Sequence, residues 1–91
     1  MKYERKPSFD NTINDLSAGR KIKAKEAISN LVIFFETKKR TPGLGLKKLR
    51  KNYWEIRTDL KDRILFRLKE DVVEFIIAGN HNEIKRYLKN V

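Results

Sequence analysis

The sequence has no cysteine and only one histidine among its 91 residues. Without cysteine, the chain can form neither a disulfide bond nor a thiolate metal site. A single imidazole and scattered carboxylates do not make a metal site either. A chain without cysteine also suits the reducing cytoplasm. We therefore expect a cytoplasmic protein that binds no metal and needs no cofactor.

Long hydrophobic runs are absent as well. No apolar stretch approaches the roughly 20 residues that a membrane-spanning helix requires. The N-terminal segment MKYERKPSFD lacks the apolar centre of a signal peptide. Glycine is scarce, and the short GLG in a basic segment does not indicate a nucleotide-binding loop. We expect a soluble protein with no membrane partner.

Positive charge is what the sequence has in excess. It contains 22 Lys and Arg against 12 Asp and Glu, which gives a net charge of +10. The 40% share of hydrophobic residues belongs to a folded chain, and the length predicts a single domain over residues 1–91. Such a charge attracts polyanions, whether nucleic acid, acidic lipid or an acidic protein, without selecting among them.

Hydrophobic periodicity predicts the element order β-α-α-β-β-β-α. The expected elements are a strand over 3–6, a helix starting after Ser8 or Asp10, a helix over 20–38, strands over 53–58, 63–69 and 72–78, and a helix after Asn80. We interpret the segment KKRTPGLGLKKLRKN as a loop. The two N-terminal helices should form a hairpin on one face of an antiparallel sheet, which makes an α+β domain. Asn80 and Glu83 predict a capping box for the last helix.

Strand alternation separates a core face from a charged face. The core face should carry Trp54, Ile56, Ile64, Phe66, Leu68, Val73, Phe75 and Ile77. The other should carry Tyr53, Glu55, Arg57, Arg63, Leu65, Arg67, Val72, Glu74, Ile76 and Ala78. A solvated surface with weak Arg–Glu pairs explains this charge. Phosphate binding is the alternative, and the concentration of arginine favours it because guanidinium groups bind phosphate bidentately.

Several segments resemble the RelE/ParE superfamily of bacterial toxins. They are LGLKKLRKNYWEIR, DRILFRL, VVEFIIAG and the terminal helix with Tyr87. The resemblance covers nearly the whole chain, includes the element order, and is closest to the RelE- and HigB-like branches that cut messenger RNA. The RelE branch has lysines where this chain has Tyr53 and Glu55. Because Glu55 is usual in the WEIR-type branch, the departure indicates a sub-branch.

The resemblance implies a small RNA endonuclease, an mRNA interferase that acts without metal, often in the ribosomal A site, and is held in check by an antitoxin. In such toxins the 2′-OH of the preceding ribose attacks the scissile phosphate and a cyclic phosphate results. Arg63 matches the arginine that usually binds this phosphate, and Arg57 matches a basic residue on the preceding strand. Tyr87 matches a tyrosine used for base stacking or proton transfer.

The expected reaction needs a base, an acid and positive charge on the phosphate oxygens. Arg63 can supply the charge together with Arg57 or Lys61. His81 has the only side chain that ordinarily titrates near neutrality, so it can act as acid or base with Glu55 as its partner. Each residue also has a structural alternative. His81 can cap or pack, Glu55 can neutralise an arginine, and Tyr87 can fill the core beside Ile84 and Leu88.

A basic rim should supply salt-dependent RNA affinity rather than sequence choice. Its expected members are Lys47, Lys48, Arg50, Lys51, Lys61, Arg67 and Lys85. The predicted partners are messenger RNA, the ribosomal A site and an acidic antitoxin. The antitoxin should lay a helix across the basic surface or against the two N-terminal helices. Two alternatives remain at this point: a ParE-like toxin that binds DNA gyrase without being an enzyme, and an inactive module that binds RNA or antitoxin.

Overall fold

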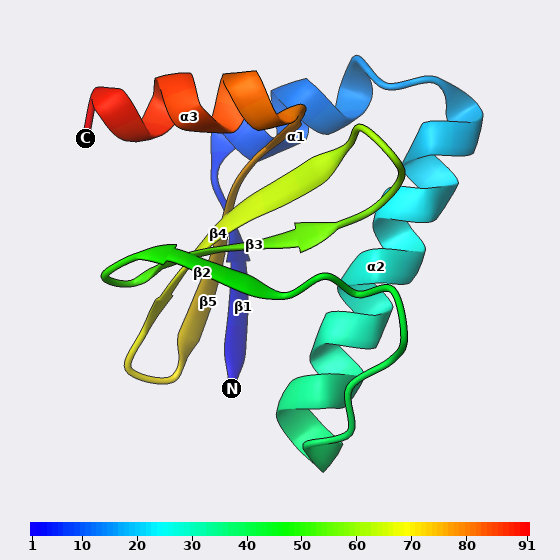
Figure 1. The fold of residues 1–91 in the computed structure, drawn as a ribbon, viewed down its shortest axis with the longest axis vertical. Helices are drawn as coiled ribbons and strands as arrows, with labels where there is room; N and C mark the ends of the chain where they lie inside the picture. The colour runs from blue at the N-terminus through cyan, green and yellow to red at the C-terminus, as the bar shows by residue number, and fades with distance from the viewer.

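The fold consists of three helices and a five-stranded sheet, described over residues 1–91 by a computed structural model (Figure 1). Its elements are β1 (Lys2–Arg5), α1 (Pro7–Asn14), α2 (Ala18–Thr37), β2 (Lys47–Arg50), β3 (Tyr53–Arg57), β4 (Arg63–Lys69), β5 (Val72–Gly79) and α3 (His81–Lys89). The predicted α+β class and the C-terminal order of strands and helix are confirmed. Helix α1 begins earlier than expected, at Pro7, because proline suits the first helical position.

The sheet has the strand order β1-β5-β4-β3-β2. Strands β2 to β5 form an antiparallel meander, whereas β1 runs parallel to β5. The sheet is therefore mixed, and the expectation of a wholly antiparallel sheet was wrong at this edge. The expected loop before residue 53 also contains a strand, β2, which pairs with β3 and breaks register between Lys48 and Arg50. The hydrophobic periodicity did not indicate β2, because its sequence KKLR contains only one apolar residue.

Helices α1 and α2 cover one face of the sheet, which we call the α2 face. The main core there consists of Phe9, Ala24, Ala27, Leu31, Leu44, Ile56, Ile64, Phe66, Val73, Phe75 and Ala78. The two helices run in different directions instead of antiparallel (Figure 1). Helix α1 extends past the end of β1, where Ser8 Oγ donates to the Ile76 carbonyl at 2.7 Å and Thr12 Oγ1 accepts from the Ala78 amide at 2.9 Å. These bonds satisfy backbone groups that β1 is too short to reach.

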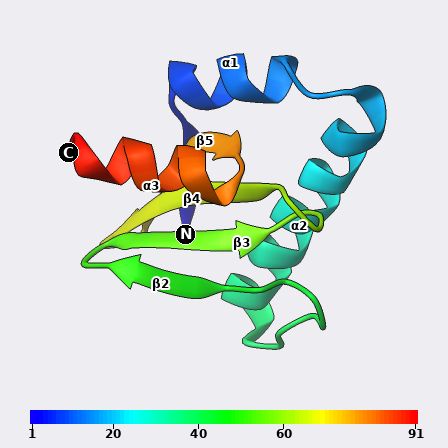
Figure 2. The same cartoon turned by 45° about the horizontal axis from the view of Figure 1, so that its top comes forward.

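Helix α3 packs on the opposite face, which we call the α3 face (Figure 2). Its buried residue Ile84 contacts Leu65 and Ile76 there. The last helix therefore lies on the face opposite α1 and α2, because this second apolar cluster also needs a cover. The predicted capping box is confirmed: Asn80 Oδ1 accepts from the Glu83 amide at 2.9 Å, and Glu83 Oε1 accepts from the Asn80 amide at 3.0 Å.

A β-bulge in β5 changes which side chains face the core. Leu65 is opposite Ile77 while Phe66 is opposite Phe75, so Ile76 is an extra residue in β5. Beyond the bulge the alternation is reversed. Ile77 packs with the α3-face cluster and Ala78 enters the main core, the reverse of the expected placement. None of the helices is both long and apolar enough to cross a membrane.

Candidate functional site: a charged sheet face beside helix α3

A largely buried ion pair lies on the α3 face, where β4 begins. Arg63 Nη1 on β4 donates to Glu55 Oε2 on β3 at 3.2 Å. The Glu55 side chain is 5% exposed and that of Arg63 is 19% exposed. The other carboxylate oxygen, Oε1, and the guanidinium Nε are both buried without a partner. The pair therefore keeps one free acceptor and one free donor, although an unsatisfied buried polar group costs about 1–3 kcal/mol.

Further positive charge surrounds this pair. Arg57 on β3 is directly opposite Arg63 in register, and Lys47 on β2 is directly opposite Glu55. Both added cations are exposed. Like charges directly opposite each other destabilise a sheet, and one carboxylate cannot neutralise all these cations. An anion bound here would relieve the repulsion.

The loop before β2 fixes the position of Arg57. The Arg57 amide donates to the Leu44 carbonyl at 2.8 Å. Gly45 follows with φ of +62°, and a Cβ built on it would come within 2.9 Å of the Arg57 Cβ. Only glycine allows the loop to pass so close in this left-handed conformation. The GLG segment therefore supports the charged face rather than a nucleotide loop.

His81 lies at the edge of the same face. It is exposed and is the first residue of α3, two residues after Gly79, which is opposite Arg63 in register. It forms no hydrogen bond or ion pair, so the expected partnership between His81 and Glu55 is not present; Glu55 binds Arg63 instead. The capping box occupies amides at the start of α3, so any role of His81 depends on its imidazole rather than on the helix terminus.

Tyr87 lies two turns further along α3. It is half-buried and packs against the cluster of Leu65, Ile76 and Ile84, together with Leu88. Its packing role is therefore the one that the apolar stripe of α3 predicts. Tyr53 packs against the same cluster from β3. The two phenol rings thus border the apolar cluster of the α3 face.

The expected basic rim divides between the two faces. Lys48 lies over the Trp54 ring at 5.9 Å, on the side of the main core. Arg50 lies over the Tyr53 ring at 5.6 Å and donates to the Val91 carbonyl at 3.2 Å, so it joins the α3 face to the C-terminus. Arg67 is neutralised by Glu74 at 3.3 Å. The remaining members, Lys51, Lys61 and Lys85, are exposed.

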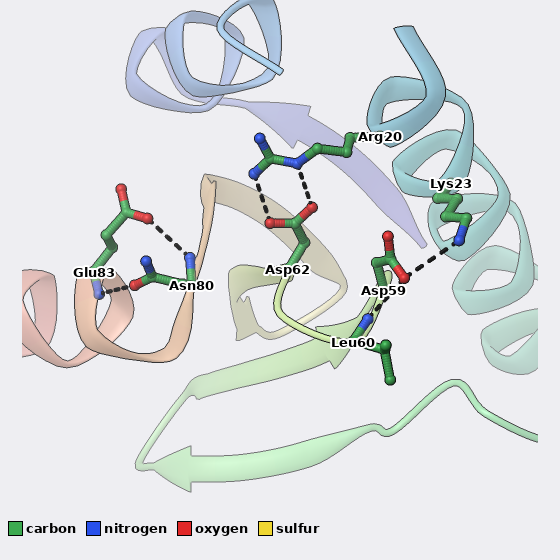
Figure 3. Close-up of polar contacts among 7 residues, drawn as sticks. All are labelled: Arg20, Lys23, Asp59, Leu60, Asp62, Asn80 and Glu83. Carbon is green, nitrogen blue, oxygen red and sulfur yellow. Dashed lines mark hydrogen bonds and ion pairs between the residues drawn. The ribbon is translucent and has the colours of Figure 1, made fainter. Parts of the chain in front are cut away.

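One further ion pair, between Arg20 and Asp62, was not predicted. Arg20 on α2 binds both carboxylate oxygens of Asp62, at 2.7 Å each, in the turn between β3 and β4 (Figure 3). Asp62 is the only buried charged residue besides Glu55. The partners are 42 residues apart, so no local pattern relates them.

A cavity lies away from the charged face, between β1, α1 and α2. Its volume is about 620 Å³, and it combines an apolar lining from Tyr3, Phe9 and Ile28 with basic residues such as Lys21 and Lys25. Burial, and secondarily Glu36, raise the pKa of Tyr3. Nowhere does the chain bring together a group of histidines and carboxylates that could hold a metal ion.

The chain has the fold that is found in RelE and YoeB/ParE toxins. The RelB–RelE antitoxin–toxin complex from Methanococcus jannaschii matches with a TM-score of 0.70 at 17% identity, over 92% of this chain and 96% of that chain. The YoeB/ParE toxin from Agrobacterium tumefaciens matches with a TM-score of 0.68 at 20% identity, over 89% and 99%.

A third similar structure is the DinJ–YafQ complex from Escherichia coli. It matches with a TM-score of 0.61 at 15% identity, over 90% of this chain and 94% of that chain. No protein-family model matches the sequence, and no curated protein matches it either. At these identities the similarity establishes the fold, which the resemblance of the sequence had predicted.

Proposed function

We propose that this protein is the toxin of a type II toxin–antitoxin system and that it cleaves messenger RNA. The observation that carries the proposal is the buried Glu55–Arg63 pair, which keeps a free carboxylate oxygen and a free guanidinium nitrogen on a rigid sheet. Excess positive charge from Arg57 and Lys47 lies around it. The sequence resemblance to the RNA-cutting branches of the superfamily supports the same activity.

The arrangement suits attack by a ribose 2′-OH on the adjacent phosphate. Arg63 and Arg57 bind the nonbridging phosphate oxygens and stabilise the charge that develops on them. A carboxylate oxygen of Glu55 takes the proton of the 2′-OH as the O2′–P bond forms, once binding of the RNA has opened access to this buried side chain. His81 gives a proton to the O5′ atom as the P–O5′ bond breaks. The products are a 2′,3′-cyclic phosphate and a 5′-hydroxyl end.

The remaining groups bind RNA in this proposal. Lys47 contacts the backbone beside the scissile phosphate, and Tyr87 stacks on a base at the border of the apolar cluster. The exposed lysines Lys51, Lys61 and Lys85 meet messenger RNA and the ribosomal RNA of the A site. Phosphate contacts of this kind give affinity without choosing a sequence.

The proposed regulator is an acidic antitoxin. Two of the structurally similar proteins were crystallised as toxin–antitoxin complexes, RelB–RelE and DinJ–YafQ. The cavity between α1 and α2, with its apolar lining and its lysines, suits the apolar side of an acidic helix. Neutralising part of the net charge of +10 would favour the same partner.

The test is induction in a bacterial host with mapping of RNA ends. Wild type should arrest growth and create new ends within translated regions. Arg63→Lys should relieve the arrest, because it keeps a charge near Glu55 but loses the bidentate fork. Arg5→Ala is the matched control, since it removes an arginine ion pair, to Asp10 at 3.5 Å, that lies at β1 on the far edge of the sheet.

Two outcomes would contradict this function. Growth arrest with intact messages and damaged DNA would favour the gyrase-binding alternative. Unchanged growth and unchanged messages, with folded protein in the cell, would favour a module that binds RNA or antitoxin without activity.

A further inference from the structure

We propose that Arg20, near the start of helix α2, is a positioning residue that acts on Arg63 through Asp62. The proposal rests on the function proposed above, in which Arg63 binds the scissile phosphate. Asp62 directly precedes Arg63 and ends the turn that leads into β4. The contacts that hold Asp62 therefore decide where β4 begins and to which face Arg63 points.

Arg20 holds the Asp62 carboxylate by both oxygens. Its Nε donates to Oδ2 and its Nη2 donates to Oδ1, each at 2.7 Å (Figure 3). These are charge-assisted bonds in the bidentate geometry that arginine alone provides. The Asp62 side chain is only 9% exposed, so removal of Arg20 would leave a buried carboxylate without a partner.

The backbone of Asp62 closes the same turn. Its carbonyl accepts from the Thr58 amide at 3.0 Å and from the Asp59 amide at 3.4 Å. A second ion pair joins Asp59 to α2, where Lys23 Nζ lies 3.3 Å from Oδ1 (Figure 3). The turn is therefore fixed to α2 at two points, and the Arg20 contact is the shorter and more buried one.

Strand alternation carries this constraint to Arg63. Successive side chains of a strand point to opposite faces. With Asp62 held towards α2, Arg63 must lie on the α3 face, where it meets Glu55. A shift of one residue in the turn would exchange the two positions.

Arg20 also occupies a position that its own helix disfavours. The first turn of α2 contains no acidic residue, and Ser17 makes no capping bond. A cation there opposes the positive end of the helix dipole. Residues that break a local rule often serve a constraint elsewhere in the fold. The hydrogen bond to Asp62 raises the pKa of Arg20, although arginine is charged in proteins in any case.

Arg20 lies near both segments that carry proposed catalytic residues, the start of β4 and the start of α3. A shallow cavity of about 460 Å³ is lined by Arg20, by the turn and by Asn80 and Glu83 at the start of α3. His81 lies between Asn80 and Glu83 in the chain. One cation on α2 thus faces the segments that carry Arg63 and His81.

The kinetic test measures single-turnover cleavage on programmed ribosomes with the full chain. Arg20→Gln and Asp62→Asn should each lower the maximal rate about tenfold or more, with KM little changed, because a displacement near 1 Å can cost about 100-fold. Arg20→Lys should regain part of the rate. Lys23→Ala is the matched control: it removes the neighbouring exposed pair to the same turn and should leave the rate within about twofold.

A nuclear magnetic resonance spectrum of the Arg63 Nε–Hε group separates this proposal from the proposed function. The signal should move in Arg20→Gln and stay in place in Lys23→Ala. If the signal and the rates of Arg20→Gln match the wild type, the positioning role is wrong. If the wild type does not cleave RNA, the proposed function fails, and a fixed Arg63 signal in Arg20→Gln would overturn the positioning role as well.

Discussion

Among single residues, Glu55 and Arg63 carry the proposed function, and their buried pair is a weak source of stability. Burying two charges costs several kcal/mol per ion, and the attraction offsets this only when the remaining hydrogen-bonding groups are satisfied. Here the free Glu55 oxygen and the Arg63 Nε have no partners. Groups of this kind in a native fold call for a ligand, a water or a reaction.

Arg63→Ala should destabilise the fold as well as remove the site. It leaves the Glu55 carboxylate buried and unpaired, so the free energy of unfolding should fall by about 3–5 kcal/mol. Urea denaturation measures this change. Replacing Glu55 by glutamine in the same chain should recover most of the loss. An unchanged unfolding midpoint in Arg63→Ala would show that the carboxylate has another partner. Arg63→Lys is therefore the safer probe of activity.

Tyr3→Phe should stabilise the protein. The Tyr3 hydroxyl is buried without a partner, so its removal should gain up to about 1 kcal/mol. Burial raises the pKa of Tyr3 from its ordinary value of 10.0. The unfolded chain then loses this proton first, so wild-type stability falls as pH rises above that value. The melting temperature of Tyr3→Phe should therefore exceed that of the wild type by a larger margin at this alkaline pH. A difference in melting temperature that stays constant across alkaline pH would contradict this.

Among the elements, the alternation of side chains along regular strands and the N-cap of α3 could be predicted from the sequence. The bulge that interrupts the alternation in β5 could not. Trp54 and Ile56 face the main core as the period of the strand predicts. Asn80 caps α3 as its sequence pattern predicts. The bulge at Ile76 left no such trace, because a run of apolar residues looks alike in either register. Ile77 and Ala78 were consequently assigned to the wrong faces.

Strands at the two edges of the sheet were harder to predict than those at its centre. Strand β2 carries lysine and arginine on both faces, a composition typical of a protected edge rather than of a strand core. The parallel pairing of β1 depends on β5, about 70 residues later in the chain. The Arg20–Asp62 pair has the same origin, since tertiary contact alone brings its partners together.

The second ion pair of the β3–β4 turn should show its pH dependence in acid. The backbone bond from Leu60, followed by Lys23, lowers the pKa of Asp59 from 3.8. Its contribution is present above that value and is lost as pH falls through the folded pKa. Asp59→Ala should therefore lower the melting temperature at neutral pH, and the difference from wild type should close below pH 3.8. A difference that persists in strong acid would assign the effect to the turn backbone.

Across the whole molecule, the net charge of +10 is less informative than its distribution. Lys47 and Arg57 lie on the α3 face with Arg63, whereas Lys48 lies over Trp54 on the other side. Affinity for single-stranded RNA should depend on the α3 face, because only there are cations gathered around a partly neutralised pair.

Salt dependence of RNA binding tests this distribution. Each phosphate contact with a single strand contributes about −0.7 to the slope of log K against log salt. Lys47→Ala should therefore make the slope shallower by about 0.7. Lys48→Ala, its neighbour in the sequence, should leave the slope unchanged. If fluorescence titrations show the same change of slope for Lys47→Ala and Lys48→Ala, RNA does not bind the α3 face in preference to the α2 face.

The most direct measurement is the chemistry of the RNA ends in single-turnover reactions on programmed ribosomes. Wild type should leave a 2′,3′-cyclic phosphate on one fragment and a 5′-hydroxyl on the other, because the 2′-OH attacks while Glu55 and His81 move protons. Arg63→Lys should slow formation of the same ends on folded protein. Fragments with 5′-phosphate ends, or no cleavage by folded wild type, would contradict a 2′-OH attack at the Glu55–Arg63 pair.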